Sequence, residues 1–259
     1  LLSGAGWEVG MVIGLFMALA GWTSGLVILG KLVADERGCT WHARSCYAAL
    51  VFGYIGLLAF LAFVLGASPG WAFASMKIGS VALLLPIYLT VAHRMFPFFA
   101  SGVVPCYKPW RPMWWLAAMW ALLVVHLGME LVHAYAWLWL VDVPLLLLSL
   151  LALWHWWPRK RMPGLLAVLF FGLAWLPVTF ALYVVQSLGY LLTDQFMLGR
   201  APMHAMYVGF FGILLIAMVT RVTQGHSGRP LVMPPAAWFA FIAIQLVAVT
   251  RIAAELSGD

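Results

Sequence analysis

Charged residues are scarce in this chain, and their scarcity excludes several classes of protein. Only 8% of the 259 residues are charged, whereas 65% are hydrophobic, and the mean hydropathy is +1.02. A soluble domain is about one quarter charged and about half apolar. A chain of this composition cannot hide its apolar surface in a water-soluble core. Nucleic-acid binding and disorder are therefore excluded, and the composition predicts a membrane protein.

The chain also contains few cysteines. The chain contains only Cys39, Cys46 and Cys106, which are too few and too scattered for a disulfide framework. Their spacing matches no CxxC metal or redox motif. We therefore expect three thiols that are buried or lie in loops and have no special role.

Long hydrophobic runs are what the chain has in abundance. A membrane-spanning helix needs about 20 mostly apolar residues, and eight segments meet this requirement: 7–29, 45–66, 71–92, 112–130, 135–157, 164–187, 202–221 and 235–256. The segments between them are short, and no repeat of fixed period stands out. The sequence predicts an all-α, polytopic transmembrane helix bundle in which residues 1–259 form a single transmembrane domain.

The loops between these spans carry their positive charge on one side. Only Arg200 and Arg251 fall on the other side. The basic side has Lys31, Arg37, Arg44, Arg94, Lys108, Arg111, Arg159, Lys160, Arg161, Arg221 and Arg229. Cytoplasmic loops are enriched in lysine and arginine. We therefore expect a multi-pass protein of the bacterial inner membrane with its basic loops in the cytoplasm and both chain ends at the periplasmic side.

Candidate ligands form a layer near the opposite, exterior side. On a continuous helix, His126, Glu130 and His133 would share one face, and Met203 and Met206 flank His204. Imidazole suits haem iron, copper and zinc, and a thioether suits copper(I) or haem. Two carboxylates at similar depth, Asp142 and Asp194, could orient a ligating histidine. The alternative is that these residues are interfacial polar groups that hold no metal.

A second polar layer lies at the basic side. Arg221, His226 and Arg229, with two glycines between them, could hold an anion such as a haem propionate or a phosphate. Alternatively, they form a basic loop that merely ends a helix. His93 and Arg94 form a second basic helix end that leads into an aromatic turn, and the two stretches could be neighbours. Because His204 and His226 are separated by about 33 Å of helix, they cannot share one metal.

Four short motifs resemble those of the NnrS family. Arg94-Met-Phe-Pro-Phe-Phe99 resembles its R-x-I-P-F-F motif, and His204-Ala-Met-Tyr-Val-Gly209 resembles H-A-x-x-x-G. Met218-Val-Thr-Arg221 resembles M-x-x-R, and Gly225-His-Ser-Gly-Arg-Pro-Leu231 resembles G-H-T-G-R-P-L. The resemblance covers about residues 94–256, with the motifs in the family's order. Trp41-His42-Ala43-Arg44 only partly matches the family's N-terminal W-H-A-H-E-M motif, because it lacks the second histidine and the glutamate.

The resemblance implies a function. Members of this family are described as polytopic membrane proteins that contain haem and copper and act in nitric oxide metabolism and protection from nitrosative stress. For this chain it implies haem b and copper as cofactors, and nitric oxide or another small gas as a partner in addition to membrane lipid. His126 or His133 would pair with His204, and Arg94, Arg221 and Arg229 would shape the basic end.

Two other functions remain open. Intramembrane Lys77, Glu130 and Asp142, together with several prolines, would suit a transporter of a small solute or metal. A chain with so little mass outside the membrane would also suit an accessory subunit that binds other membrane subunits of a larger redox or monooxygenase complex. The sequence does not indicate which reaction, if any, is catalysed.

Overall fold

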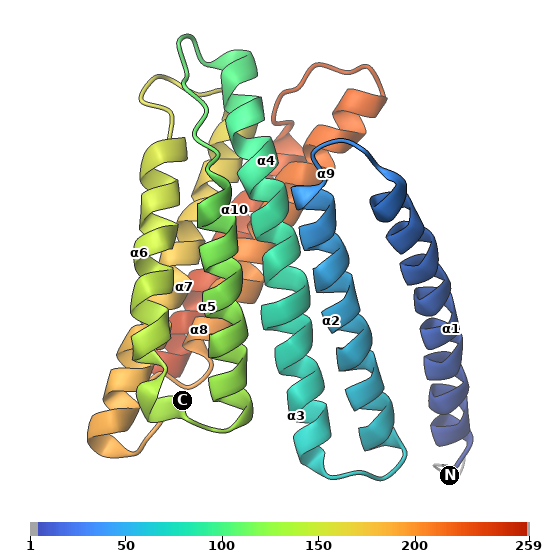
Figure 1. Cartoon of the computed structure of the whole chain (residues 1–259). Helices are drawn as coiled ribbons and strands as arrows, with labels where there is room; N and C mark the ends of the chain where they lie inside the picture. Colours follow the sequence, from blue (N-terminus) through green and yellow to red (C-terminus); the bar gives the residue numbers. More distant parts are fainter. Residues whose placement is uncertain (1–4, 258–259) are drawn as a thin grey trace. The chain divides into compact units, whose positions relative to one another are not determined.

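The structure, a computed structural model, describes the backbone of residues 5–257 and the side chains from Val9 onward. Figure 1 shows that this part of the chain consists of helices joined by short loops. Their bounds are α1 (Ala5–Asp35), α2 (Trp41–Val64), α3 (Pro69–Lys77), the π-helix η1 (Ile78–Leu84), α4 (Leu85–Val103), α5 (Met113–Leu131), the 3-10 helix η2 (Tyr135–Trp137), α6 (Trp139–Trp156), α7 (Gly164–Thr193), α8 (Ala201–His204), the π-helix η3 (Ala205–Gly212), α9 (Ile213–His226) and α10 (Pro235–Ser257).

These elements combine into eight helices that are long and apolar enough to cross a membrane. In two of them a π-helix joins two α-helices without a break: α3, η1 and α4 form one span, and α8, η3 and α9 form another. No strand occurs within residues 5–257. The predicted all-α bundle of eight spans is therefore confirmed, and the chain is a multi-pass membrane protein.

Several spans end later than predicted, namely the first at Asp35, the third, the sixth at Thr193 and the seventh. The third span continues to Val103, so the stretch from Arg94 to Phe99 is helical, and the predicted aromatic turn is wrong. Pro97 lies inside this helix, and the Ser101 hydroxyl donates a hydrogen bond to its carbonyl. Membrane helices tolerate proline because neighbouring groups satisfy the freed backbone. The seventh span likewise continues to His226 rather than ending at Arg221.

The chain divides into two compact units. Unit 1 comprises residues up to Ala92 together with Glu130–Val132, and unit 2 comprises His93–Met129 and the residues from His133 onward. The prediction of a single transmembrane domain remains a prediction. Unit 1 is formed by packing of α1 on α2 and of α2 on α3 and η1. The indole of Trp22 donates a hydrogen bond to the Leu50 carbonyl (3.1 Å), which joins α1 to α2.

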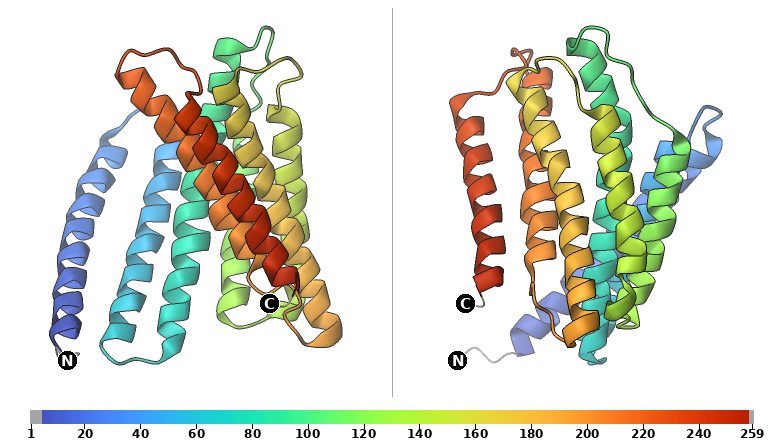
Figure 2. Two further views of the ribbon diagram at one scale, coloured as in Figure 1. Left: turned by 180° about the vertical axis from the view of Figure 1, so that it is seen from behind. Right: turned by 90° about the vertical axis from the view of Figure 1, so that its left-hand side faces the viewer.

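Unit 2 is organised around α7, the span with the largest buried share among the described helices. This helix packs against α6, η3 and α9 (Figure 2). The contact with η3 requires glycine at position 209, because a Cβ there would lie 2.5 Å from the Trp175 ring. The Trp175 indole in turn donates a hydrogen bond to Gln245 of α10 at 2.8 Å. Unit 2 is therefore held by close helix packing with a few polar links.

Candidate functional site

Each π-helix begins directly after an ionisable residue. Lys77 is the last residue of α3 and precedes η1, and His204 is the last residue of α8 and precedes η3. Pi-helical turns are rare and occur frequently at functional sites. Ionisable residues inside a membrane are costly and are functional candidates for that reason. These two positions are therefore the first places to look for a site.

Lys77 pairs with a glutamate within unit 1. Its ammonium nitrogen lies 2.5 Å from Oε1 of Glu130, near the C-terminal end of α5, and both side chains are buried. Lys77 also lies over the Phe73 ring at 5.6 Å. The sequence offered Glu130 as a metal ligand, but the structure places a lysine ammonium beside its carboxylate. A cation already compensates this charge, which argues against Glu130 as a metal ligand.

His204 pairs with a glutamate within unit 2. Its Nε2 lies 3.3 Å from Oε1 of Glu255 on α10, and both side chains are about one quarter exposed. The other carboxylate oxygen accepts a hydrogen bond from the backbone N–H of Arg200 at 2.9 Å. Gly199, with φ +49°, lies so close that a Cβ would be 2.1 Å from the carboxylate. Glycine at this position therefore allows the carboxylate to reach the start of α8.

The two pairs lie at equivalent positions of an arrangement of helices that occurs twice in the chain. His204 and the start of η3 lie 127 residues after Lys77 and the start of η1, and Arg221 follows Arg94 at the same interval. The first four spans include one helix with a π-helical segment, and the last four include the other. In each set of four, the glutamate comes from the last span. The repetition is not visible in the sequence, because few residues are identical at an interval of 127 residues.

A third pair lies on α5 and α6 within unit 2. Nδ1 of His126 is 2.7 Å from Oδ1 of Asp142, and both side chains are almost completely buried. A carboxylate can only accept, so Nδ1 carries the proton and donates it. In the neutral ring Nε2 then carries the lone pair with which imidazole binds metals. The His126 ring meets Tyr183 of α7 edge to face at 5.1 Å.

The predicted histidine and glutamate ligands form no group of three among the described side chains. Within the described residues, no group of three or more His, Cys, Asp or Glu side chains could hold a metal ion. The predicted shared face on α5 is wrong at His133, because the helix ends at Leu131 and His133 has a φ of +57°. His133 is exposed, and its Nδ1 lies 2.7 Å from the Tyr135 hydroxyl. Of the methionines beside His204, Met206 is buried and Met203 is half-buried.

The basic motifs meet at the other end of unit 2. The Arg221 guanidinium lies 3.7 Å above the Phe99 ring, so the predicted neighbourhood of the two stretches is confirmed. Arg94, His226 and Arg229 are exposed. His204 and Arg221 are separated by seventeen residues, or roughly 25 Å of helix. A haem held near His204 could not place its propionates on these arginines, so the predicted cofactor-binding residues belong to two separate layers.

Sequence reasoning missed Glu255 and undervalued Lys77. Glu255 is one of only eight acidic residues in the chain, and its place near the end of the last predicted span was a usable signal. Lys77 was considered as an intramembrane charge that would suit a transporter. A third buried group is His93, whose Nε2 donates to the Pro112 carbonyl at 3.2 Å and whose ring stacks on Trp115. Both partners lie at the start of α5, and the sequence does not define where this helix begins.

Comparison with known proteins identifies the family. The family model described as NnrS protein matches residues 1–259, which is the whole chain and more than the motifs cover. No curated protein and no solved structure matches the chain significantly. This multi-pass membrane protein, which contains the two glutamate pairs and the His126–Asp142 pair, is therefore a member of the NnrS family.

Proposed function

We propose that this chain binds a haem b through His126 and acts in nitric oxide handling or in protection from nitrosative stress. The observation that carries the proposal is the buried His126–Asp142 pair, with Nδ1 and Oδ1 2.7 Å apart. Metal-ligating histidines almost always donate their other ring N–H to a carboxylate, a carbonyl or water. Membership of a family described as containing haem and copper supports the same conclusion.

The donor set of the described residues suits haem better than an ion held by protein alone. A haem would need only one or two ligands from the protein. The structure brings together no three His, Cys, Asp or Glu side chains within residues 5–257. A single oriented imidazole such as His126 meets the requirement of a haem.

The chain's own residues then have defined roles. The Asp142 carboxylate would hold the proton of His126 on Nδ1, leave Nε2 as the ligand atom and, together with Tyr183, fix the ring plane. A haem with one histidine ligand offers an open position for a diatomic gas. Burial of the pair keeps water from competing for the imidazole. His204, with Met203 and Met206, remains the proposed copper position, with Glu255 as the group that orients it.

A visible absorption spectrum of the detergent-purified chain, as isolated and after dithionite, tests the proposal. We expect a Soret band that shifts on reduction, is lost in His126→Ala and is kept in the control His155→Ala. In Asp142→Asn the ligand remains but its carboxylate partner is lost. That variant should retain less haem, by about 10- to 100-fold in affinity, and its midpoint potential should rise. A wild-type spectrum without a Soret band would contradict the proposal.

The proposed location is the bacterial inner membrane, with the basic loops in the cytoplasm and both ends of the chain at the periplasmic side. The excess of Lys and Arg on one side supports it. Cys39 and Cys106 are exposed in loops of the basic side. A membrane-impermeant maleimide should therefore label them in inverted vesicles and not in intact spheroplasts. The reverse pattern would contradict this orientation.

Transport is the second candidate function, and a separate observation favours it. Lys77, which directly precedes a π-helix in the third span, forms a buried pair with Glu130 near the end of the fourth span. Such ionisable residues mark ion and proton pathways in membrane proteins. Proteoliposomes loaded with a pH-sensitive dye would test this function. Proton or metal flux that is lost in Glu130→Gln would support transport, whereas absence of flux alongside a haem spectrum would support the first proposal.

A further inference from the structure

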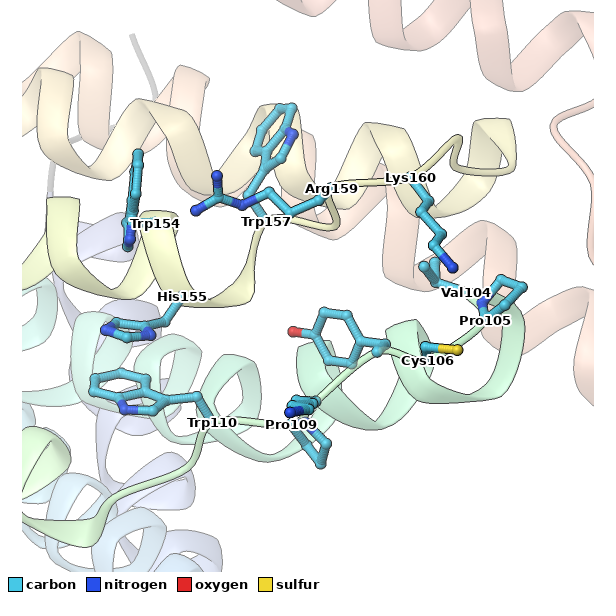
Figure 3. Close-up of a pocket in the computed structure, with 12 residues that line it drawn as sticks. Val104, Pro105, Cys106, Pro109, Trp110, Trp154, His155, Trp157, Arg159 and Lys160 are labelled. Carbon is cyan, nitrogen blue, oxygen red and sulfur yellow. The ribbon is translucent and has the colours of Figure 1, made fainter.

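A pocket opens at the basic end of unit 2. It has a volume of about 390 Å³ and lies between the loop that follows α4 and the C-terminal end of α6. Figure 3 shows its lining side chains. Three are cationic, namely Lys108, Arg159 and Lys160, and none is acidic. We call this the basic pocket. Its net positive charge would attract an anion.

The wall of the basic pocket is ordered by hydrogen bonds and ring stacking. The Tyr107 hydroxyl donates to the Trp156 carbonyl at 2.8 Å, and the Trp156 indole donates to the Trp110 carbonyl at 2.8 Å. The rings of Trp110 and His155 stack with their centroids 4.5 Å apart. Burial raises the pKa of Tyr107 to about 12, so this residue stays neutral and adds no negative charge. The pocket is thus a built feature of the fold.

An apolar groove adjoins the basic pocket. It has a volume of about 560 Å³ and is lined by Leu147, Leu150, Leu151, Leu153, Trp154, Trp157 and Arg159. We call it the leucine groove. It shares Trp154, Trp157 and Arg159 with the basic pocket. The Arg159 guanidinium lies 4.1 Å from the centre of the Trp154 ring, at the junction of the two.

The depth of these two features matches the structure of a lipid. The spans that contain α5 and α6 both end at the basic pocket, at Met113 and Trp156. The basic pocket therefore lies at headgroup level, and the leucine groove follows α6 from Trp154 back to Leu147, toward the hydrocarbon layer. A cationic pocket at the interface suits a phosphate group, and an apolar groove that continues inward suits an acyl chain. Free phosphate would use only the first.

We propose that this surface is a binding site for an anionic phospholipid, with the phosphate in the basic pocket and one acyl chain along the leucine groove. Positive charge in cytoplasmic loops is common in membrane proteins, but topology alone requires neither the ordered pocket nor the adjoining groove. The site is separate from the His126–Asp142 pair, which lies near the other end of α5. The proposal therefore does not depend on haem binding.

Native mass spectrometry of the full chain, with phosphatidylglycerol, phosphatidylcholine or inorganic phosphate added, tests the proposal. We expect retention of phosphatidylglycerol well above that of phosphatidylcholine, and no displacement by phosphate. Arg159→Gln/Lys160→Gln should weaken phosphatidylglycerol binding about thirtyfold, since each cation near the surface contributes about a fivefold effect. The matched control Arg111→Gln/Arg161→Gln removes two exposed charges that line neither feature and should bind as the wild type does.

The groove is tested separately. Leu147→Ser/Leu150→Ser should weaken phosphatidylglycerol binding about tenfold by removing apolar contact. Leu140→Ser, an exposed residue near the other end of α6, should leave it unchanged. Equal retention of both lipids, displacement by inorganic phosphate, or equal losses in the test and control variants would each overturn the proposal. Displacement by phosphate would show that the pocket takes a free anion instead.

Discussion

The chain contains the same local arrangement twice, with opposite degrees of burial. Lys77 and Glu130 are 2.5 Å apart and buried, whereas His204 and Glu255 are 3.3 Å apart and about one quarter exposed. Lys77 and His204 each directly precede a π-helix. A buried ion pair is costly to break, but a partly exposed pair contributes little. The difference is that one copy encloses its ion pair in the protein, while the other leaves its imidazole partly exposed.

The largest effect is expected from breaking the buried pair. Lys77→Met leaves the Glu130 carboxylate without its ammonium partner. We expect a loss of about 3–5 kcal/mol in the free energy of unfolding. Reversible unfolding by SDS in mixed micelles would measure it.

The double variant Lys77→Met/Glu130→Leu removes both charges and serves as the control. Replacement of a buried ion pair by apolar residues is often neutral or stabilising, so we expect stability close to that of the wild type. If Lys77→Met were as stable as the double variant, the pair would not be a buried ion pair.

An intermediate effect is expected at Gly199. The added Cβ of Gly199→Ala would lie against the Glu255 carboxylate and would force a positive φ on a residue with a side chain. We expect a loss of about 1–3 kcal/mol, measured by the same unfolding experiment. Gly102→Ala, where a Cβ would meet nothing within 4 Å, is the matched control and should cost far less.

The smallest effect is expected from the exposed pair. Glu255→Gln and His204→Gln should each change the free energy of unfolding by about 1 kcal/mol or less. His204→Lys places an ammonium group beside Glu255 and removes the imidazole. It should be as stable as the wild type and should bind less copper, as measured by elemental analysis. A loss of several kcal/mol in these variants would show that the exposed pair stabilises the protein as much as the buried pair does.

Much of the fold could be predicted from sequence. Runs of apolar residues gave eight spans because a membrane imposes a fixed length on each helix. The ends of the spans were harder to predict. A proline usually ends a helix in a soluble protein, but Pro97 lies inside a helix here. The left-handed backbone of His133 was also hidden, because residues other than glycine are uncommon at positive φ.

The candidate site was only partly predictable. Asp142 was expected to orient a histidine, and its carboxylate does lie beside His126. The partners of Lys77 and His204 could not be deduced, because they come from helices that lie more than 50 residues away in sequence. Spacing along one helix reveals shared faces, but only the packing of different helices decides which charges meet.

The proposal that His126 binds haem is tested most directly by the haem content per chain, measured as the pyridine haemochrome. The measurement compares the wild type, His126→Ala and His204→Ala. The buried, carboxylate-oriented imidazole of His126 is the proposed ligand. We therefore expect about one haem per chain in the wild type and in His204→Ala, and almost none in His126→Ala. Haem that persists in His126→Ala but is lost from His204→Ala would contradict it, as would a wild-type chain without haem.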